Sequence, residues 1–251
     1  MPIAATKDGW PHGNLILSAV PAEERDAWRP YLGAVDVRAG ESLYHVPDQL
    51  TWVYFPLDCV VAAIGINRRG ATSEYATLGH EGFVGLNAFL GDSRAGGHAL
   101  VVLPGRAWRL PAPPLRETFE RSVAFRSVIL RYAASRVFQI SQTSLCQAHH
   151  SVEQRLSRWL LQLCDRVAAG ELPLTHELVA IVHGVRREAV TNAIKRLQAP
   201  GAIRASRGRI AVLDRARLQE LSCECYAELR QDVALLEREM ALLRPPPPRP
   251  R

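Results

Sequence analysis

The stretch THELVAIVHGVRREAVTNAIKRLQAPGAIRASRGRIAVLD, residues 175–214, decides the fold of the C-terminal half of this chain. Thr175 is a favourable N-cap for a short helix, and Gly184 can adopt the backbone conformation of a tight turn after it. A second helix is expected from Arg186 to Ala199, because apolar residues recur on one of its faces at helical spacing. The residues on that face are Val190, Ile194 and Leu197. Two short helices joined by a glycine-containing turn form a helix-turn-helix.

The residues after the second helix predict a β-hairpin. Pro200 and Gly201 end the helix, and the segment AIRASRGRIAVLD then alternates in character on either side of a turn at residues 206–208. A hairpin in this position is the wing of a winged helix-turn-helix. It carries three arginines, Arg204, Arg207 and Arg209.

The start of the second helix carries the strongest chemical signal. Arginine at a helix N-terminus opposes the helix dipole by about 0.3–1 kcal/mol, so the fold alone does not favour Arg186 and Arg187 there. Recognition helices place their first residues in the major groove, where Arg reads guanine and Asn reads adenine. We therefore predict that the chain binds double-stranded DNA. The predicted base-reading residues are Arg187, Glu188 and Asn192, and the predicted phosphate contacts are Arg186, Thr191, Lys195, Arg204, Arg207 and Arg209.

The placement of charge also favours a polyanionic partner for this half. The net charge of the chain is +6. Residues 1–115 carry 9 Lys and Arg against 11 Asp and Glu, whereas residues 152–215 carry 11 against 6. Positive charge gathered in one half is typical of a domain that meets nucleic acid. The alternative is a winged-helix module that binds another protein and whose basic face is solvated.

The N-terminal part is expected to be rich in β-strands. Between residues 36 and 110, short segments rich in Val, Tyr, Trp, Ile and Thr are bounded by Gly, Pro, Asn or Asp. The segment around Asn67 and Gly70 is typical of a hairpin turn. Short strands at this spacing predict a compact β-barrel or β-roll. A first helix is expected near residues 20–32.

A long helix is expected over residues 115–148, because this stretch contains neither Gly nor Pro. It has two apolar faces and should therefore contact two structures. One face is a stripe that we predict to be the seam of a homodimer: Val123, Leu130 and Val137 at seven-residue spacing, with Ala134 interleaved. The other holds Phe125, Ile129, Tyr132 and Ile140. A helix buried within a single subunit is the alternative.

These patterns together predict an α+β fold in four parts. Residues 1–114 form a sensor β-roll, 115–148 the connecting and dimerisation helix, and 149–215 the winged helix-turn-helix, which begins with a helix over 152–170. Residues 216–251 form a charged helix and a proline-rich tail. The sequence shows neither a secretory signal nor an apolar run that could span a bilayer, so we expect a cytoplasmic protein without a membrane partner.

The chain resembles the Crp/Fnr superfamily of bacterial transcription regulators over nearly its whole length. The segments that carry the resemblance are YFPLDCVVAAI, GHEGFVGLNAFLGD, HSVEQRLSRWLLQLCDRV, LPLTHELVA, GVRREAVTNAIKRLQ and RGRIAVLDRARLQELSCECY. The resemblance implies a cyclic-nucleotide-binding-like β-roll and a homodimer on a pseudo-palindromic promoter site. RNA polymerase is a further candidate partner.

The sequence departs from the family pattern inside the recognition helix. That helix usually opens Ser-Arg-Glu and has a second Arg five positions after the first, but Arg186 and Asn192 occupy the first and last of these positions here. The family's usual half-site is therefore not expected. His183 stands at a normally aliphatic position, where we expect a packed core histidine.

The resemblance also bears on the loop GFVGLNAFLGDSRAGGHALV, residues 82–101. Relatives that bind cyclic nucleotides hold the ribose with a Glu after a glycine, and hold the phosphate with an Arg-Ser/Thr pair. Leu86 and Gly97-His98 stand at those positions, and losing a charge-assisted contact costs about 1.5–3 kcal/mol. Arg94, a few residues earlier, is the alternative phosphate ligand. We predict a degenerate effector pocket that does not use cyclic AMP, formed by Gly85, Leu86, Arg94, Gly97 and His98.

The cysteines predict neither a disulfide framework nor a cofactor. Only Cys59 lies in the first 145 residues, which excludes an N-terminal iron–sulfur cluster on ligand number. Cys146, His149 and His150 have a spacing that can ligate a metal ion or haem iron, but an ordinary helix end is the simpler interpretation. Cys223 and Cys225 would lie about 200° apart on a helix, so a shared ligand site is not expected, and a redox role is left open.

No enzymatic activity is predicted. The sequence has no paired nucleophile and base, no phosphate-binding P-loop and no zinc-protease motif. The function expected is therefore DNA-binding transcription regulation. The alternative is a haem-, metal- or protein-binding signalling module with a degenerate DNA-binding domain.

Overall fold

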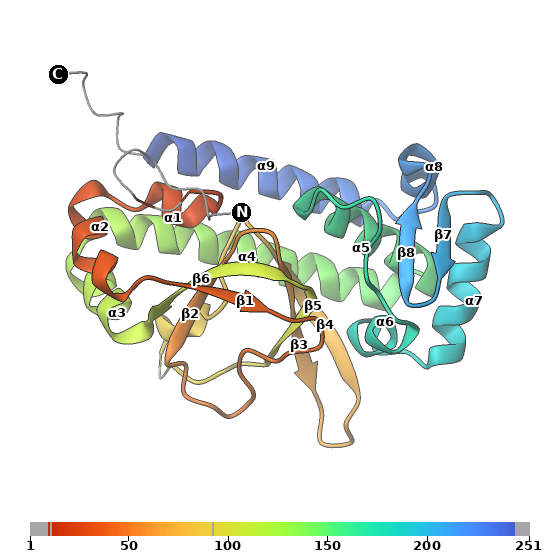
Figure 1. Cartoon of the computed structure of the whole chain (residues 1–251), viewed down its shortest axis with the longest axis horizontal. Coiled ribbons are helices and arrows are strands. Elements are labelled where there is room, and N and C mark those ends of the chain that lie inside the picture. Colours follow the sequence, from red (N-terminus) through yellow and green to blue (C-terminus); the bar gives the residue numbers. More distant parts are fainter. Residues whose placement is uncertain (1–9, 11, 92, 244–251) are drawn as a thin grey trace.

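The computed structural model describes residues 10, 12–91 and 93–243 (Figure 1). Two short helices and a 3-10 turn precede the first strand: α1 (Leu15–Ala19), α2 (Ala22–Trp28) and η1 (Arg29–Tyr31). The helix expected near residues 20–32 is present as α2 and η1, but it is not the first helix, because α1 precedes it. Val20 and Pro21 are both extended and separate α1 from α2, because Pro21 lacks the N–H that would continue the first helix.

The strands of the N-terminal part form two antiparallel sheets, and the predicted β-roll is confirmed. Their orders are β1-β6-β2 and β4-β3-β5. The strands are β1 (Gly33–Val37), β2 (Trp52–Pro56), β3 (Val60–Ile66), β4 (Thr72–Leu78), β5 (His98–Leu103) and β6 (Gly105–Pro111). The 3-10 turn η2 (Leu86–Ala88) lies in the loop between β4 and β5. Asn67 makes the turn between β3 and β4, because its side chain accepts hydrogen bonds from the Arg69 and Ala71 N–H groups.

The long helix begins later than expected. The stretch assigned to one helix over 115–148 is divided into α3 (Ala112–Arg121) and α4 (Val123–His149). Ser122 is extended, accepts a hydrogen bond from the Phe125 N–H (3.2 Å) and so caps α4. Neither Gly nor Pro marks this break in the sequence, and a serine side chain makes it instead.

One face of α4 is buried and the opposite face is exposed. The buried face holds Phe125, Ile129 and Tyr132, as expected, and packs against α3, β4 and the C-terminal helix. Ile140 is 41% exposed and does not belong to that face. The predicted seam is exposed along its length: Val123 (69%), Leu130 (51%) and Val137 (64%), with Ala134 also exposed. An apolar stripe on the surface is therefore available for a second subunit.

The C-terminal part has the predicted winged helix-turn-helix order. Its elements are α5 (Val152–Arg166), α6 (His176–His183), α7 (Arg187–Gln198), β7 (Ile203–Ser206), β8 (Arg209–Val212) and α8 (Arg215–Glu220). α5 begins with a capping box between Ser151 and Gln154. It ends at Arg166, four residues earlier than the helix predicted over 152–170.

The last helix returns to the sensor. The charged helix expected from residue 215 onward is interrupted, because residues 221–224 are not helical and α9 (Cys225–Leu243) starts anew. In Figure 1, α9 runs back along α4 over the top of the molecule. Leu236 and Met240 are buried in the same apolar core as the β-roll. The proline-rich tail, 244–251, lies outside the described residues. No helix among the described residues is long and apolar enough to cross a membrane.

Candidate nucleic-acid interface

The helix-turn-helix is formed by α6, a three-residue turn and α7. The Thr175 hydroxyl accepts a hydrogen bond from the Leu178 N–H (3.1 Å) and caps α6. Gly184 has φ +63°, a left-handed conformation that favours glycine. A Cβ atom at this position would lie 2.3 Å from the Thr72 carbonyl oxygen. Glycine is therefore required here by both the backbone conformation and the close approach of β4.

α7 separates apolar and polar residues cleanly between its two faces. Val190, Ala193, Ile194 and Leu197 are buried. The three predicted base-reading residues, Arg187, Glu188 and Asn192, are exposed. Together with Thr191 they line a shallow surface hollow at the start of the helix. The fold therefore brings these side chains together on one accessible face, at the helix end that enters a major groove in this class of motif.

The wing lies directly beside this face. Its turn is made by Arg207 (φ +46°) and Gly208 (φ +76°), the pair of left-handed residues that a tight hairpin needs. A groove runs between α7 and the wing, and its polar lining residues are His176, Thr191, Lys195, Gln198, Ser206, Arg207 and Arg209. The predicted contacts from the helix and from the wing therefore form one continuous surface.

Several of the side chains predicted to contact phosphate already have partners within the protein. The Thr191 hydroxyl donates to the Arg187 carbonyl (3.1 Å) and lies 3.1 Å from His176 Nδ1. Arg204 and Arg209 lie 3.4 and 3.9 Å from the Glu171 carboxylate. These are exposed pairs and worth less than about 1 kcal/mol, so a phosphate can replace Glu171. No pattern in the sequence singles out His176, which follows the cap of α6 and reaches the groove because α6 packs on α7.

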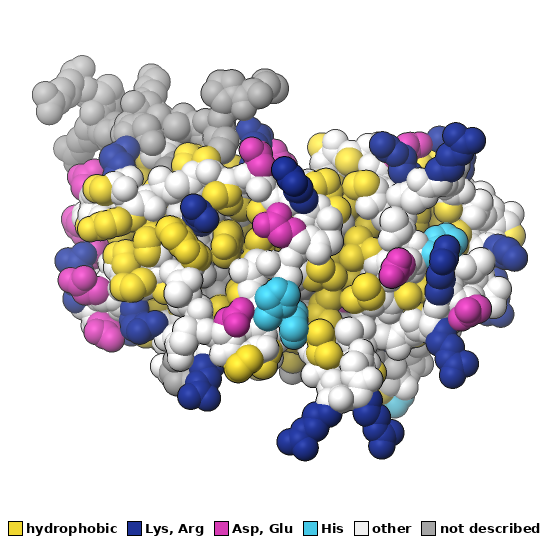
Figure 2. Space-filling model, turned by 60° about the horizontal axis from the view of Figure 1, so that its bottom comes forward, with side chains coloured by type: hydrophobic (Ala, Val, Ile, Leu, Met, Phe, Trp, Pro, Cys, Tyr) yellow, Lys and Arg dark blue, Asp and Glu magenta, His cyan; other side chains and the backbone are white. Residues whose placement is uncertain are grey.

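Three of the arginines that make residues 152–215 positively charged are not on the surface. Arg155, Arg158 and Arg166 are buried. Arg166 pairs with the buried Glu81 of the sensor (2.7 Å). The positive surface is correspondingly smaller than the sequence suggested. Figure 2 nevertheless shows Lys and Arg side chains spread over the right-hand part of the molecule, which the winged helix-turn-helix forms.

The loop predicted as a degenerate effector pocket is closely packed. Gly85 is left-handed (φ +109°) and the half-buried Leu86 side chain packs against the sensor core. A Cβ atom on Gly97 would lie 2.5 Å from the Tyr75 hydroxyl oxygen. The His98 and His45 rings meet edge to face, with their Nδ1 atoms 3.0 Å apart. The side chains at these positions thus contact other parts of the sensor.

One arginine lies within this loop and a second reaches it from α3. Arg94 is exposed, and its carbonyl accepts a hydrogen bond from Asn87 Nδ2 (3.0 Å). Arg116, on α3, donates to the Ala88 carbonyl (3.1 Å) and to the Ser93 hydroxyl (2.5 Å). No pattern in the sequence indicates that Arg116 lies at the loop, because only the packing of α3 brings it there. It fastens the loop to the end of the sensor.

His183 is a packed core residue, as the sequence indicated. It is 5% exposed, and its ring meets Trp159 edge to face at 5.3 Å. Its Nε2 atom has no hydrogen-bond partner among the described residues. Burial lowers the pKa of His183 well below 6.5, and the charges of Arg158 and Arg155 lower it further. The imidazole is therefore neutral in the folded chain.

The sensor contacts the helix-turn-helix directly. The Thr72 hydroxyl at the start of β4 donates to the Ile181 carbonyl of α6 (2.6 Å). The next residue, Ser73, donates to Gln147 on α4 (2.8 Å). The buried Glu74 accepts a hydrogen bond from the Trp159 indole of α5 (3.2 Å). Three consecutive residues of one sensor strand thus contact three helices.

Comparison with known proteins agrees with this architecture. A family profile described as a Crp-like helix-turn-helix domain matches residues 154–221. Curated proteins give no match. Among solved structures, the chain is similar to FixK2 from Bradyrhizobium japonicum, with a TM-score of 0.64, 17% identity and coverage of 76% of this chain and 98% of that one. It is also similar to TTHA1359, a CRP/FNR-family regulator from Thermus thermophilus, with a TM-score of 0.59, 25% identity and coverage of 76% and 98%.

A third similar structure is the c-di-GMP-responsive global regulator CLP from Xanthomonas campestris, with a TM-score of 0.59, 16% identity and coverage of 76% of this chain and 99% of that one. Fold and site thus define a class: a β-roll sensor joined by a long helix to a winged helix-turn-helix. The family profile confirms the resemblance to Crp/Fnr regulators in the C-terminal part, which is a Crp-like helix-turn-helix domain. The similar structures share the fold over about three quarters of this chain.

Proposed function

We propose that this chain is a transcription regulator that binds a pseudo-palindromic DNA site as a homodimer. The observation that carries the proposal is the accessible face of α7, which lies beside the wing across a shared groove. Arg187, Glu188 and Asn192 read base edges in the major groove. The phosphate contacts come from Arg186, Thr191, Lys195 and the wing arginines Arg204, Arg207 and Arg209.

Homodimerisation supplies the symmetry that such a site needs. The exposed apolar stripe on α4 is the proposed seam, and a two-fold axis there would present two copies of α7. Two recognition helices then meet half-sites about 34–36 Å apart on one side of the duplex.

We also propose that cyclic AMP is not the effector. Leu86 is apolar, Gly97 has no space for a larger side chain, and the His98 ring is in contact with the His45 ring. A buried phosphate in this loop would lack the arginine that usually neutralises it, which is costly. CLP from Xanthomonas campestris is described as responsive to c-di-GMP, so a protein of this fold can respond to a ligand other than cyclic AMP. Calorimetry that detects tight binding of cyclic AMP or cyclic GMP would contradict this part of the proposal.

DNA binding is tested with the full-length chain. A preferred duplex is first selected from a random library, and affinity is then measured between about 50 and 200 mM salt, over which a protein with about 6–10 phosphate contacts loses about 10³–10⁵-fold in affinity. A scrambled duplex of the same composition is the control and should bind more weakly at every salt concentration. Failure to bind any duplex at the lowest salt concentration would contradict the proposal.

A further inference from the structure

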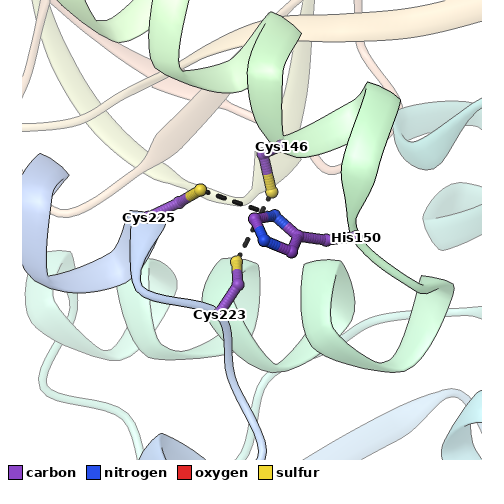
Figure 3. A group of neighbouring side chains, drawn as sticks. All are labelled: Cys146, His150, Cys223 and Cys225. Carbon is purple, nitrogen blue, oxygen red and sulfur yellow. Dashed lines mark hydrogen bonds between the residues drawn. The ribbon is translucent and has the colours of Figure 1, made fainter.

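Four metal-ligating side chains meet at the joint between the sensor and the DNA-binding domain. Cys146 and His150 come from the end of α4, and Cys223 and Cys225 come from the segment that leads into α9 (Figure 3). One ligand atom from each residue lies within 4.8 Å of all the others. The sequence predicts no metal site here, because Cys223 and Cys225 would lie on opposite sides of one continuous helix. Cys223 instead precedes α9, and the turn before the helix directs both thiols to the same point.

Two of the distances between these ligand atoms are close to those around a single tetrahedral ion. The Cys146 and Cys223 sulfurs are 3.5 Å apart, and the Cys225 sulfur is 3.6 Å from His150 Nδ1. With Zn–S bonds of about 2.3 Å and Zn–N bonds of about 2.0–2.1 Å, tetrahedral ligand atoms lie about 3.6–3.8 Å apart. Three thiolates and one imidazole are a donor set that structural zinc sites use.

The surroundings of His150 also suit a metal ligand. Its Nε2 atom lies 3.2 Å from the Glu224 carboxylate, which leaves Nδ1 directed at the three sulfurs. A carboxylate that holds the second nitrogen of a ligating histidine fixes the ring and its tautomer. Glu224 lies between Cys223 and Cys225 in the sequence, so one short segment supplies two ligands and this supporting group.

Buried positive charge beside the cluster is a second, independent observation. Arg155 and Arg158 of α5 are 9% and 2% exposed, and the Nε atom of each has no hydrogen-bond partner among the described residues. Three thiolates around one divalent ion carry a net charge of about −1, which would offset this positive charge. Both arginines interact electrostatically with the Cys146 thiol, which places this positive charge at the cluster.

We propose that Cys146, His150, Cys223 and Cys225 bind one Zn²⁺ ion, which fastens the segment between α8 and α9 to the end of α4. This site is separate from the DNA-binding surface and from the loop at residues 82–98. Because α8 belongs to the DNA-binding domain and α9 packs on the sensor, the ion holds the two parts in one relative position.

The first test is the metal content of the purified full-length chain, kept reduced and prepared without a histidine tag. Elemental mass spectrometry should find about one zinc ion per chain, and Cys223→Ser and His150→Ala should lose most of it. Two matched controls should keep it: Cys164→Ser, a half-buried cysteine on α5, and His149→Ala, the exposed neighbour of His150. Equal loss of zinc in the controls and in the ligand variants would overturn the proposal.

The second test begins with the wild-type chain, so its first result does not depend on whether any variant folds. Co²⁺ added to the zinc-free wild-type chain should give the visible bands of a tetrahedral ion and sulfur-to-cobalt charge transfer. Glu224→Gln should keep the spectrum but weaken zinc binding by about 10–100-fold in competition with a chromophoric chelator. A folded wild-type chain that takes up neither ion, or that carries a Cys146–Cys223 disulfide when isolated from a reducing cytosol, would overturn the proposal.

Discussion

At the scale of single residues, exposed side chains are expected to affect DNA binding and buried ones to affect stability. Arg187 and Arg196 illustrate the surface, because both are exposed arginines on α7. Arg187 belongs to the predicted reading face, whereas Arg196 is paired with Glu153 of α5. Comparing substitutions of Arg187 and Arg196 therefore distinguishes the loss of one positive charge from the loss of a specific contact with DNA.

Arg187→Ala is expected to weaken binding to the preferred duplex by about 1–3 kcal/mol and to relax selectivity at one base position. Arg196→Ala should cost less and leave the base preference unchanged. Binding to a set of duplexes with every single-base change measures both effects. An unchanged preference in Arg187→Ala would refute its role as a base reader.

His183 makes stability depend on pH. Its pKa in the folded chain lies well below 6.5, so the unfolded chain binds a proton that the native chain does not. The contribution to the free energy of unfolding is complete above pH 6.5 and is lost as the pH falls below it, by at most about 1.4 kcal/mol per pH unit. His183→Leu removes this loss, so its stability relative to wild type should rise as the pH is lowered.

Urea unfolding at a series of pH values between neutral and mildly acidic measures this difference. His176→Leu, on the same helix but only partly buried, is the control. Parallel pH profiles for wild type and His183→Leu would show that His183 is not the group responsible.

At the scale of elements, a buried ion pair connects the sensor to α5. Glu81, in the loop after β4, accepts hydrogen bonds from Arg166 (2.7 Å) and from the Gly79 N–H (3.2 Å). Burial raises the pKa of Glu81, but the charges of Arg166 and Arg136 outweigh this effect and leave the pKa lowered. The carboxylate is therefore ionised at neutral pH and holds α5 against the sensor.

Glu81→Gln is expected to destabilise the chain by about 3–5 kcal/mol, because it leaves Arg166 buried without its partner. Glu220→Gln, which removes an exposed partner of Arg217, should cost less than about 1 kcal/mol. Chemical unfolding at neutral pH measures both changes. Similar small losses in the two variants would mean that the buried pair contributes little.

At the scale of the whole molecule, α4 connects the sensor, α9, the proposed zinc site and the proposed second subunit. One face packs on the sensor and on α9, its end carries two of the four proposed zinc ligands, and its exposed stripe is the proposed dimer seam. The stripe lies opposite the buried face, so a second subunit can pack there without displacing α9.

Val137→Glu is therefore expected to abolish dimerisation while leaving the monomer folded, because the Val137 side chain is 64% exposed. Ala124→Glu is the control, since it adds the same charge on the same helix about 100° away from Val123 of the stripe. Sedimentation velocity measures the oligomeric state, and circular dichroism checks the fold. A dimer that persists in Val137→Glu, or a wild-type chain that is monomeric at all concentrations, would contradict the predicted seam.

The helix-turn-helix, the wing and the β-roll could all be predicted from the sequence. Their signals are local: caps such as Thr175, the glycine turn at residue 184, apolar spacing along α7 and turn residues between strands. Each of these restricts the backbone over a few neighbouring residues, so a pattern in the sequence is enough to reveal it.

Only the tertiary structure decided the cysteine and histidine cluster, the position of α9 and the burial of three arginines. Cys146 and Cys223 are 77 positions apart, and no periodicity links them. The break at residues 221–224 directs Cys223 toward α4, and the packing of α9 completes the sensor core with Leu236 and Met240. Packing likewise buries Arg155, Arg158 and Arg166, which by composition belong to a basic surface. Burial and long-range contact depend on how whole elements pack together, whereas sequence patterns report only which face of each element is apolar.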